Sequence, residues 1–197
     1  MPGKSRRIVE SDIVDMASYG LVRAERRRRM TELKRARRLE VGPFATFYFE
    51  NYETMLHQVQ EMLFIEKGGA AQLPDELRAY NPLIPQGREL VATVMFEIDD
   101  PLRRARTLGR LGGIEETAFI EIDGSRVAGA PEEDQDRTNA EGKASAVQFI
   151  HFPFMPEQIV RFCAAEARVV VGFTHPDYSH MAVMPGAVRL ALAADFA

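Results

Sequence analysis

The segment from Phe49 to Met62 places carboxylates, amides and a histidine where the residue pattern changes from strand-like to helical. Within it, Glu53, His57 and Glu61 recur at i, i+4 and i+8, a spacing that directs three side chains along one helix face toward one cation. Helical sites that bind two irons need Glu-x-x-His pairs from more than one helix, and the chain has no second pair. We therefore predict no metal site, and we interpret these side chains as a solvated face or a satisfied polar layer.

A second group of candidate residues lies at the ends of predicted strands. His151 continues the apolar face of one strand, His175 continues that of the next, and Glu50 ends an earlier strand. If these ends converge, they form a pocket with a general acid–base pair or a two-histidine, one-carboxylate metal site. The alternative is a structural role, with each imidazole held by a backbone carbonyl. The polar turn after His175, which contains Tyr178, could close over such a pocket.

Two predicted elements would position the first group. From Val41 to Glu50, apolar side chains recur with a period of two, which predicts a single strand with two largely covered faces. Asn51 then has the side chain of a helix N-cap, and Glu53 falls in the first turn, where a negative charge suits the helix dipole. This helix is predicted to run to about Lys67 and to stop at the two glycines that follow.

The N-terminal part of the chain predicts a long helix. Ser11 and Asp12 can cap its start, and apolar residues recur at helical spacing through to about Leu39. We therefore expect a helix over residues 11–39, preceded by a disordered segment of residues 1–10. The apolar positions of its stripe are Met16, Tyr19, Val22, Met30 and Leu33.

This helix is strongly basic. Between Arg23 and Arg38, nine basic residues against two glutamates give a local charge of +7, which leaves −11 for the rest of a chain whose net charge is −4. Such a segment can bind an anionic partner, or it can lie across the acidic body of its own domain or of a second copy. The run of Arg26, Arg27, Arg28 and Arg29 sweeps most of the helix circumference, so at least one arginine lies near the apolar stripe.

The remaining segments alternate between strand and helix patterns. Strands are predicted at residues 90–98, 117–122, 126–128, 146–152 and 168–174, and helices at residues 74–80, 101–113, 186–196 and from 156 onward. Asp123-Gly124 marks a tight hairpin turn, and residues 131–143 nearly lack apolar side chains, which predicts an exposed loop. This order predicts one domain, residues 1–197, with an α+β fold: a largely antiparallel or mixed sheet, the long basic N-terminal helix and several flanking helices.

Composition narrows the class of protein. With 197 residues, 46% of them hydrophobic, the chain can fill one core, and no window reaches the length of apolar sequence that a membrane span needs. The basic start leads into no apolar signal segment, so we expect a cytoplasmic protein without a membrane partner. The single cysteine, Cys163, excludes an intramolecular disulfide, and its helical setting predicts a buried, unreactive thiol. Only the basic helix favours nucleic acid, and we do not expect that partner.

Several segments together resemble a known family. They are Phe49-Glu50-Asn51 with Glu53-Thr54, Gln58-x-Gln60-Glu61-Met62, Tyr80-Asn81-x-Leu83-Ile84-Pro85, Glu89-Leu90-x-Ala92-Thr93 and Ser145-Ala146-Val147-Gln148-Phe149. From about Ala36 to Phe196 the chain resembles the uncharacterised bacterial family numbered 3501 among the domains of unknown function. The resemblance implies a bacterial cytoplasmic protein, expected near rubrerythrin-like and iron–sulfur oxidoreductase proteins and so linked to redox or oxidative-stress metabolism. It implies importance, but no chemistry, for Glu50, Asn51, Glu53, Gln58, Gln60 and Glu61.

Our leading hypothesis is a non-catalytic accessory protein of such a redox system. Its Glu50–Glu61 surface, with the arginines from Arg26 to Arg29, would hold a protein partner or another copy of the chain. The alternative is an enzyme, or a protein that binds a small ligand or a metal in a pocket of carboxylates and histidines. The residues of that pocket would be Glu50, Glu53, Glu61, His151 and His175. The sequence identifies neither a cofactor nor a catalytic residue.

Overall fold

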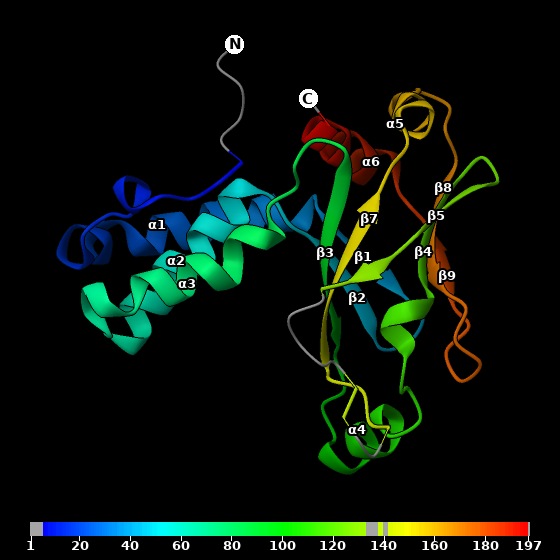
Figure 1. The fold of residues 1–197 in the computed structure, drawn as a ribbon, viewed down its shortest axis with the longest axis horizontal. Helices are drawn as coiled ribbons and strands as arrows, with labels where there is room; N and C mark the ends of the chain where they lie inside the picture. Colours follow the sequence, from blue (N-terminus) through cyan, green and yellow to red (C-terminus); the bar gives the residue numbers. More distant parts are fainter. Residues whose placement is uncertain (1–5, 133–137, 140–141, 197) are drawn as a thin grey trace.

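Two packed antiparallel sheets form the body of the protein, and a group of helices lies against one side of it (Figure 1). The computed structural model describes residues 6–132, 138–139 and 142–196. The strand order is β1-β2-β3-β7-β6 in one sheet and β5-β4-β8-β9 in the other. The strands are β1 (Arg38–Val41), β2 (Ala45–Phe49), β3 (Glu89–Phe96), β4 (Ala118–Ile122), β5 (Ser125–Ala128), β6 (Ala130–Pro131), β7 (Val147–Pro153), β8 (Val169–Phe173) and β9 (Met181–Val183).

The helices fall into three places around the sheets. In Figure 1, α1, α2 and α3 project to the left of the five-stranded sheet, α5 and α6 lie above the sheets, and α4 lies below them. They are α1 (Met16–Arg35), α2 (Tyr52–Glu66), α3 (Leu73–Tyr80), α4 (Pro101–Leu108), α5 (Pro156–Cys163) and α6 (Gly186–Ala193), with short 3-10 turns at Glu10–Asp12, Gly69–Ala71, Asn81–Leu83, Ile114–Thr117 and Ala194–Phe196. This arrangement confirms the predicted α+β fold with its long basic N-terminal helix.

The main hydrophobic core lies between the two sheets. Phe47 and Phe49 of β2 are buried there, and the ring of Phe47 lies 5.1 Å from that of Phe173 across the core. Aromatic pairs at this separation stabilise the fold by more than the burial of their surface area alone. Because side chains alternate along a strand, Tyr48 and Glu50 must leave the opposite face of the sheet. That outer face is where α2 and α3 pack.

A second, smaller core joins the helices to this outer face. Val59 and Leu63 of α2 pack with Val91 of β3. Ile8, from the N-terminal segment, and Ile84, from the segment before β3, belong to the same cluster. Burial of these apolar side chains fixes the helices over one part of the sheet, at roughly 25 cal/mol per Å² of apolar area removed from water. The neighbouring part of the outer face is left only partly covered.

The prediction of one continuous strand from Val41 to Glu50 was wrong. Val41 ends β1, the chain turns, and β2 begins at Ala45, so that the two strands form a hairpin. β1 and β2 are joined by a short turn in which Gly42 has φ +69°. Val41 pairs directly with Ala45, so both side chains lie on the same face of the sheet. A turn of this length preserves the period of two across the reversal, and the alternation therefore could not reveal it.

The N-terminal helix is shorter than predicted. It begins at Met16, where the side chain of Asp15 accepts a hydrogen bond from the Ser18 amide at 3.0 Å, and it ends at Arg35. Ser11 and Asp12 lie in a 3-10 turn instead. Of the predicted apolar stripe, Tyr19 and Met30 are buried, whereas Val22 is exposed. The helix packs mainly on α2 rather than on a sheet, so it needs only a narrow apolar contact.

The two segments predicted as disordered or exposed are described in part. Residues 1–5 lie outside the described residues, but Ile8 is only 1% exposed, and its amide donates to the Asn81 side chain at 2.7 Å. The predicted disorder therefore does not extend over residues 6–10. In the predicted loop 131–143, residues 133–137 and 140–141 lie outside the described residues, while Thr138 forms an isolated antiparallel bridge with Ala144.

Most other predicted elements are confirmed, with two corrections. The Asp123-Gly124 turn joins β4 and β5 with positive φ at both residues, as its sequence predicted. The helix expected over residues 101–113 ends at Leu108. Cys163, expected to be buried, is exposed because it ends α5 on the side away from the core.

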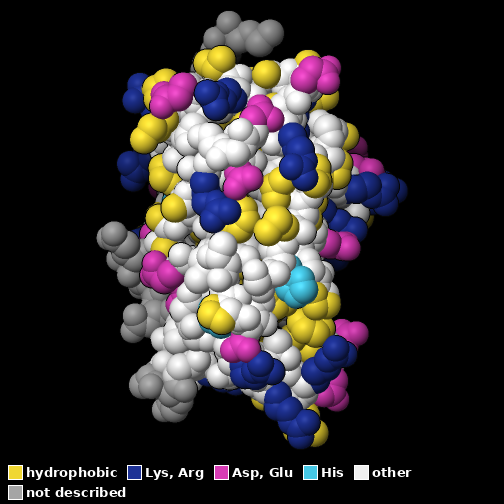
Figure 2. Space-filling model, turned by 90° about the vertical axis from the view of Figure 1, so that its right-hand side faces the viewer, with side chains coloured by type: hydrophobic (Ala, Val, Ile, Leu, Met, Phe, Trp, Pro, Cys, Tyr) yellow, Lys and Arg dark blue, Asp and Glu magenta, His cyan; other side chains and the backbone are white. Residues whose placement is uncertain are grey.

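The side of the molecule opposite α1 to α3 has a mixed surface. Figure 2 shows basic and acidic side chains interspersed there with hydrophobic ones. Met181 and Val183 of β9 are among the exposed hydrophobic residues of this protein. Within the part of the chain that the structure describes, no helix combines the length and apolar character needed to cross a membrane.

Candidate functional site

A cavity of about 360 Å³ opens between the outer face of the five-stranded sheet and helices α2 and α3. Its volume is within the range of small-molecule sites in proteins, roughly 300–1,000 Å³. Its walls combine apolar and aromatic side chains with a few polar groups, the usual character of such sites. The lining residues are Lys34, Tyr48, Glu50, Met55, Gln58, Tyr80, Leu83, Thr93, Met95, Val147 and Phe149.

The sheet supplies the floor of this cavity through its register. Tyr48 of β2 is paired with Thr93 of β3, and Thr93 is paired with Phe149 of β7. Residues directly opposite one another in an antiparallel sheet present their side chains on the same face. Met95 and Val147 form the next pair on that face. Glu50 follows the end of β2 and continues the side on which Tyr48 lies.

Glu50 is the most unusual residue of the cavity. Its exposure is only 4%, and one carboxylate oxygen, Oε1, accepts a hydrogen bond from the Thr93 hydroxyl at 2.8 Å. Among the described residues, no donor lies within hydrogen-bonding distance of the other oxygen, Oε2. Buried polar atoms are nearly always hydrogen-bonded, because an unpaired group loses its solvation without compensation. Among the described residues, Glu115 Oε2 and Gln148 Oε1 are also buried without a donor, but of these three residues only Glu50 lines this cavity.

The start of α2 sets the position of Glu50. Asn51 adopts an extended conformation and its side chain accepts from the Thr54 amide at 3.0 Å, while the Thr54 hydroxyl accepts from the Asn51 amide at 2.9 Å. This reciprocal capping confirms the predicted helix start. The Glu50 amide donates to the carbonyl of Val91 at 2.8 Å, which continues the sheet up to the cap. Glu50 is thus held from both sides by backbone geometry.

Helices complete the walls and bring two more polar groups. Gln58 of α2 forms a side-chain hydrogen bond with Tyr80 of α3, whose pKa is raised, chiefly by burial. Lys34 comes from the last turn of α1, and within the described residues no carboxylate forms an ion pair with it. The cavity is therefore lined by one buried anion, one cation without an ion-pair partner, and a largely apolar surface between them.

The acidic face predicted on α2 is turned toward the protein's own basic helix. Glu61 accepts two hydrogen bonds from Arg23, both at 2.8 Å, and one from the Tyr19 hydroxyl at 2.7 Å. The hydrogen bond from Arg23 is the main reason that the pKa of Glu61 is lowered to about 2. Glu53 forms an exposed ion pair with Arg29 at 3.0 Å. These carboxylates hold α1 on α2, and neither lines the cavity that contains Glu50.

Gln60 also has a structural role. It is 1% exposed, and its amide group makes two hydrogen bonds of 2.9 Å with the backbone of Val14, one as acceptor and one as donor. Phe64, on the same side of α2, is covered by the Tyr19 ring at 5.6 Å and by the Arg23 guanidinium at 4.9 Å. The pairing of helices α1 and α2 therefore accounts for both residues.

The strand-end histidines and Tyr178 lie in settings of their own. His151 lies between Glu89, at 3.0 Å from Nδ1, and Glu132, at 2.7 Å from Nε2, and its pKa is raised chiefly by Glu89. His175 faces the carbonyl of Gly112 at 3.2 Å through Nε2, and its Nδ1 accepts from the next-but-one amide. Neither histidine lines the cavity that contains Glu50.

Tyr178 secures the first hairpin. Its hydroxyl donates to the carbonyl of Val41 at 2.8 Å and accepts from the amides of Phe44 and Ala45 at 3.0 and 2.9 Å. Burial raises the pKa of this phenol. Three backbone groups of the β1–β2 turn thus converge on one side chain, which serves the fold rather than a pocket closure.

The basic run on α1 is only partly engaged. The Arg26 guanidinium lies 5.7 Å from the centre of the Tyr19 ring, and Arg29 pairs with Glu53. Arg27 and Arg28 are exposed. A groove of about 280 Å³ runs between α1 and α2 beside Arg26 and Arg29. We predicted that at least one arginine of this run lies near the apolar stripe, and Arg26 does so through its contact with the Tyr19 ring.

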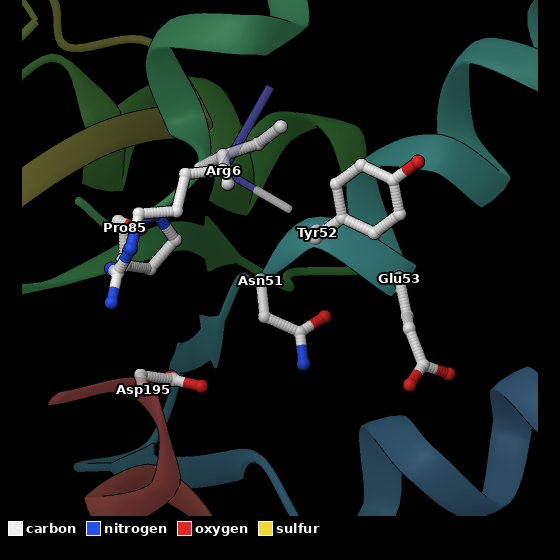
Figure 3. A pocket seen from close by; sticks show the side chains of 7 residues that line it. Arg6, Asn51, Tyr52, Glu53, Pro85 and Asp195 are labelled. Carbon is white, nitrogen blue, oxygen red and sulfur yellow. Dashed lines mark hydrogen bonds between the residues drawn. The ribbon is translucent and has the colours of Figure 1, made fainter. Parts of the chain in front are cut away.

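A second cavity, of about 230 Å³, lies at the N-terminus of α2 (Figure 3). The carboxylate of Asp195 and the amide of Asn51 point toward the same space, and Arg6 lies beside Pro85. The polar groups here already have partners: Arg6 donates to the Pro85 carbonyl at 3.1 Å, and Asp195 pairs with Arg37. This cavity is consequently a weaker candidate for a ligand than the one around Glu50.

The alternative interpretation of the sequence includes a metal held by carboxylates and histidines. In residues 6–132, 138–139 and 142–196, no group of three or more histidine, cysteine, aspartate or glutamate side chains is arranged to hold a metal ion.

The geometry defines a class of protein: an α+β protein of two packed antiparallel sheets, with a cavity of small-molecule size between one sheet and its helices. Residues 7–196 match the family described as "Protein of unknown function (DUF3501)", and the chain belongs to this family. A crystal structure of a protein of unknown function from Burkholderia pseudomallei K96243 is similar, with a TM-score of 0.89 and 30% sequence identity, over 96% of this chain and 99% of that chain. No curated protein matches the chain.

Sequence reasoning identified only part of the cavity. Glu50 and Gln58 were predicted site residues, and both line it. Tyr48 and Thr93 were missed, although the period of two places Tyr48 on the same strand face as Glu50. Lys34 gave no local signal, because its contribution depends on how α1 lies across α2.

Proposed function

We propose that this protein binds a small organic ligand in the cavity around Glu50, and that the ligand donates a hydrogen bond to Glu50 Oε2. The unpartnered carboxylate oxygen of Glu50, a residue that lines the cavity, carries the proposal. A ligand donor compensates the lost solvation of that oxygen, which is the condition under which a buried polar group contributes favourably.

Two further observations support a binding role. The lining includes three aromatic side chains, Tyr48, Tyr80 and Phe149, which provide a large contact area with little loss of side-chain freedom. In addition, Glu50, Thr93 and several other lining residues belong to the segments that carry the family resemblance. Those segments are distant in sequence and come together at the cavity.

Methionine methyl groups provide the test of this proposal. Met55 and Met95 line the cavity, and their methyl NMR signals can be assigned with Met55→Leu and Met95→Leu variants. We expect small amines, amidines and amides titrated into ¹³C-methyl-methionine-labelled protein to shift both signals. Glu50→Gln keeps the side-chain shape but removes the charge, and it is expected to weaken binding by about tenfold or more, since hydrogen bonds to charged groups are the stronger ones.

The matched control is Glu53→Gln, because Glu53 is exposed, lies in the first turn of the same helix and is not part of this cavity. Its affinity for the compounds should equal that of the unaltered protein. A compound panel that leaves the Met55 and Met95 signals in place, or binding that is unchanged in Glu50→Gln, contradicts the proposal.

The accessory role in redox metabolism and the cytoplasmic location stay predictions from the family resemblance. A partner role for the basic run of α1 also stays a prediction, and the exposure of Arg27 and Arg28 supports it. The surface from Glu53 to Glu61 is less suited to a partner than we expected, because Glu61 is already bound to Arg23.

A further inference from the structure

We infer that the ligand of the Glu50 cavity is a zwitterion, with an ammonium group directed to Glu50, a carboxylate directed to Lys34 and an apolar side chain between them. This inference rests on the proposed function and adds the chemical class of the ligand. It follows from the pairing of one unpartnered buried anion with one cation on the wall of the same cavity.

The Glu50 end favours an ammonium over a neutral donor. Glu50 is only 4% exposed, and its Oε1 already accepts a hydrogen bond from Thr93. A neutral donor satisfies the geometry of Oε2 but leaves the buried charge uncompensated, whereas an ammonium satisfies both. Tyr48 lines the same cavity, and aromatic faces attract positive charge.

The Lys34 end favours an acidic group. Lys34 lies in the last turn of a strongly basic helix, and among the described residues its ammonium has no carboxylate partner within ion-pair distance. Two arginines follow in the sequence, Arg35 at the end of α1 and Arg37 after it, and both are paired with carboxylates, Glu32 and Asp195 respectively. A ligand with only an ammonium group would therefore meet repulsion at this end, and a ligand carboxylate removes it.

The apolar wall selects for a hydrophobic side chain on the ligand. Met55, Leu83 and Phe149 come from three different elements and face the cavity together. Burying a side chain of the size of leucine or phenylalanine there contributes to affinity through the hydrophobic effect. An amphiphilic amino acid matches all three surfaces, while a polar sugar or a nucleotide leaves the apolar wall without a partner.

Entry of the ammonium requires a small movement. Oε2 has almost no solvent-exposed surface, so a ligand atom reaches it only when a lining side chain changes its rotamer. Met55 and Lys34 are long, unbranched and flexible, and they can yield at low cost. The Met55 methyl signal therefore reports on binding directly.

Three probe molecules of similar shape separate the contributions of the two charges. They are L-phenylalanine, phenethylamine, which lacks the carboxylate, and 3-phenylpropionate, which lacks the ammonium. L-leucine and L-methionine extend the series. We expect at least one of the amino acids to bind in isothermal titration calorimetry, and for that amino acid the analogue lacking either charge should bind about tenfold more weakly or worse.

Two variants assign each charge to its end of the cavity. Glu50→Gln is expected to weaken the amino acid and phenethylamine about tenfold and to leave 3-phenylpropionate unchanged, and Lys34→Met should show the reverse pattern for the two analogues. Lys67→Met is the matched control, because Lys67 follows α2 and does not line the cavity.

The outcomes distinguish this inference from the proposed function. If phenethylamine binds as tightly as the amino acid, depends on Glu50 and ignores Lys34→Met, the ligand is a simple amine: the zwitterion is overturned and the cavity proposal stands. If neutral amides bind best, the zwitterion is likewise overturned. If no probe, charged or neutral, shifts the Met55 and Met95 signals, both proposals fail.

Discussion

Glu50 lies just before α2 and Glu61 lies in the second half of that helix, and their surroundings differ. Glu61 accepts three hydrogen bonds, from Arg23 and Tyr19, and its carboxylate is fully used in holding two helices together. Glu50 accepts one hydrogen bond from Thr93 and keeps an oxygen without a protein donor. Residue type and sequence context gave both the same prediction. The difference arises because α1 lies over Glu61 and supplies its donors, Tyr19 and Arg23. Glu61 is therefore a structural carboxylate, whereas Glu50 is a candidate binding group.

The Glu61 cluster leads to a prediction about stability and pH. Its pKa is lowered from 4.5 to about 2, so its contribution to stability is fully present above 4.5 and is lost as the pH falls toward 2. Glu61→Gln is expected to lower the free energy of unfolding by roughly 1.5–3 kcal/mol near neutral pH. Urea unfolding of both proteins, measured at neutral pH and at about pH 3, checks this.

The pH dependence identifies the cause. The difference in unfolding free energy between the two proteins should shrink at the lower pH, because pH 3 lies below the ordinary pKa of glutamate, so Glu61 of the unfolded chain is protonated while Glu61 of the folded protein still binds Arg23 as an anion. Glu53→Gln, at an exposed ion pair, should change stability little at either pH. A difference for Glu61→Gln that is the same at both pH values would show that the loss comes from packing and not from the charge.

At the scale of elements, local signals predicted those features that depend on neighbouring residues. Asn51 capped the expected helix, and Asp123-Gly124 turned the expected hairpin, because caps and tight turns are formed by side chains and backbone within a few positions. The turn at Gly42 was missed because the alternation of apolar residues continues through it. The start of α1 was misplaced because an exposed helix carries a weak apolar pattern.

Gly42 offers a prediction at this scale. Its φ of +69° favours glycine, and an added Cβ would lie 2.6 Å from the His180 ring. Gly69 has a similar φ, +65°, but no atom lies within 4 Å of its added Cβ among the described residues. Gly69→Ala is therefore expected to cost about 1–2 kcal/mol from the backbone alone. Gly42→Ala should cost roughly 1–3 kcal/mol more, because His180 must move.

Thermal and urea unfolding of the two variants measure this difference. Tyr178 packs against the His180 ring at 4.6 Å between centroids, so a displaced His180 disturbs the tyrosine that binds the β1–β2 turn. Equal destabilisation by the two substitutions would mean that His180 moves aside without cost and that only the backbone conformation matters.

At the scale of the whole molecule, the cavity depends on segments that are far apart in the chain. Its floor comes from β2, β3 and β7, and its walls come from α1, α2 and α3. No periodic pattern within one segment predicts that Lys34 and Thr93 face the same space, because their approach is decided by the packing of the helices on the outer face of the sheet. The resemblance segments indicated which residues matter, and the fold explains why they occur together.

The C-terminal end is tied to the site by a buried ion pair. Arg37, which is 3% exposed, donates to Asp195 and also to the carbonyls of Phe49 and Glu50, at 3.0 and 3.1 Å. Arg37 thus joins the last turn of the chain to the segment that ends in Glu50. Removing one partner of a buried pair leaves a charge without compensation, which is far more costly than the loss of an exposed pair.

Asp195→Asn tests this connection. We expect a loss of about 3–5 kcal/mol in the free energy of unfolding, because the Arg37 charge stays buried while its counter-charge is removed. Asp75→Asn is the matched control: Asp75 pairs with Arg78 within one exposed helix, and its loss should cost at most about 0.5 kcal/mol. Since Arg37 also holds the Glu50 carbonyl, Asp195→Asn should further alter the Met55 and Met95 methyl signals, which the control leaves unchanged. A small loss in stability with unchanged methyl signals would show that the ion pair is independent of the cavity and that the C-terminal turn does not support it.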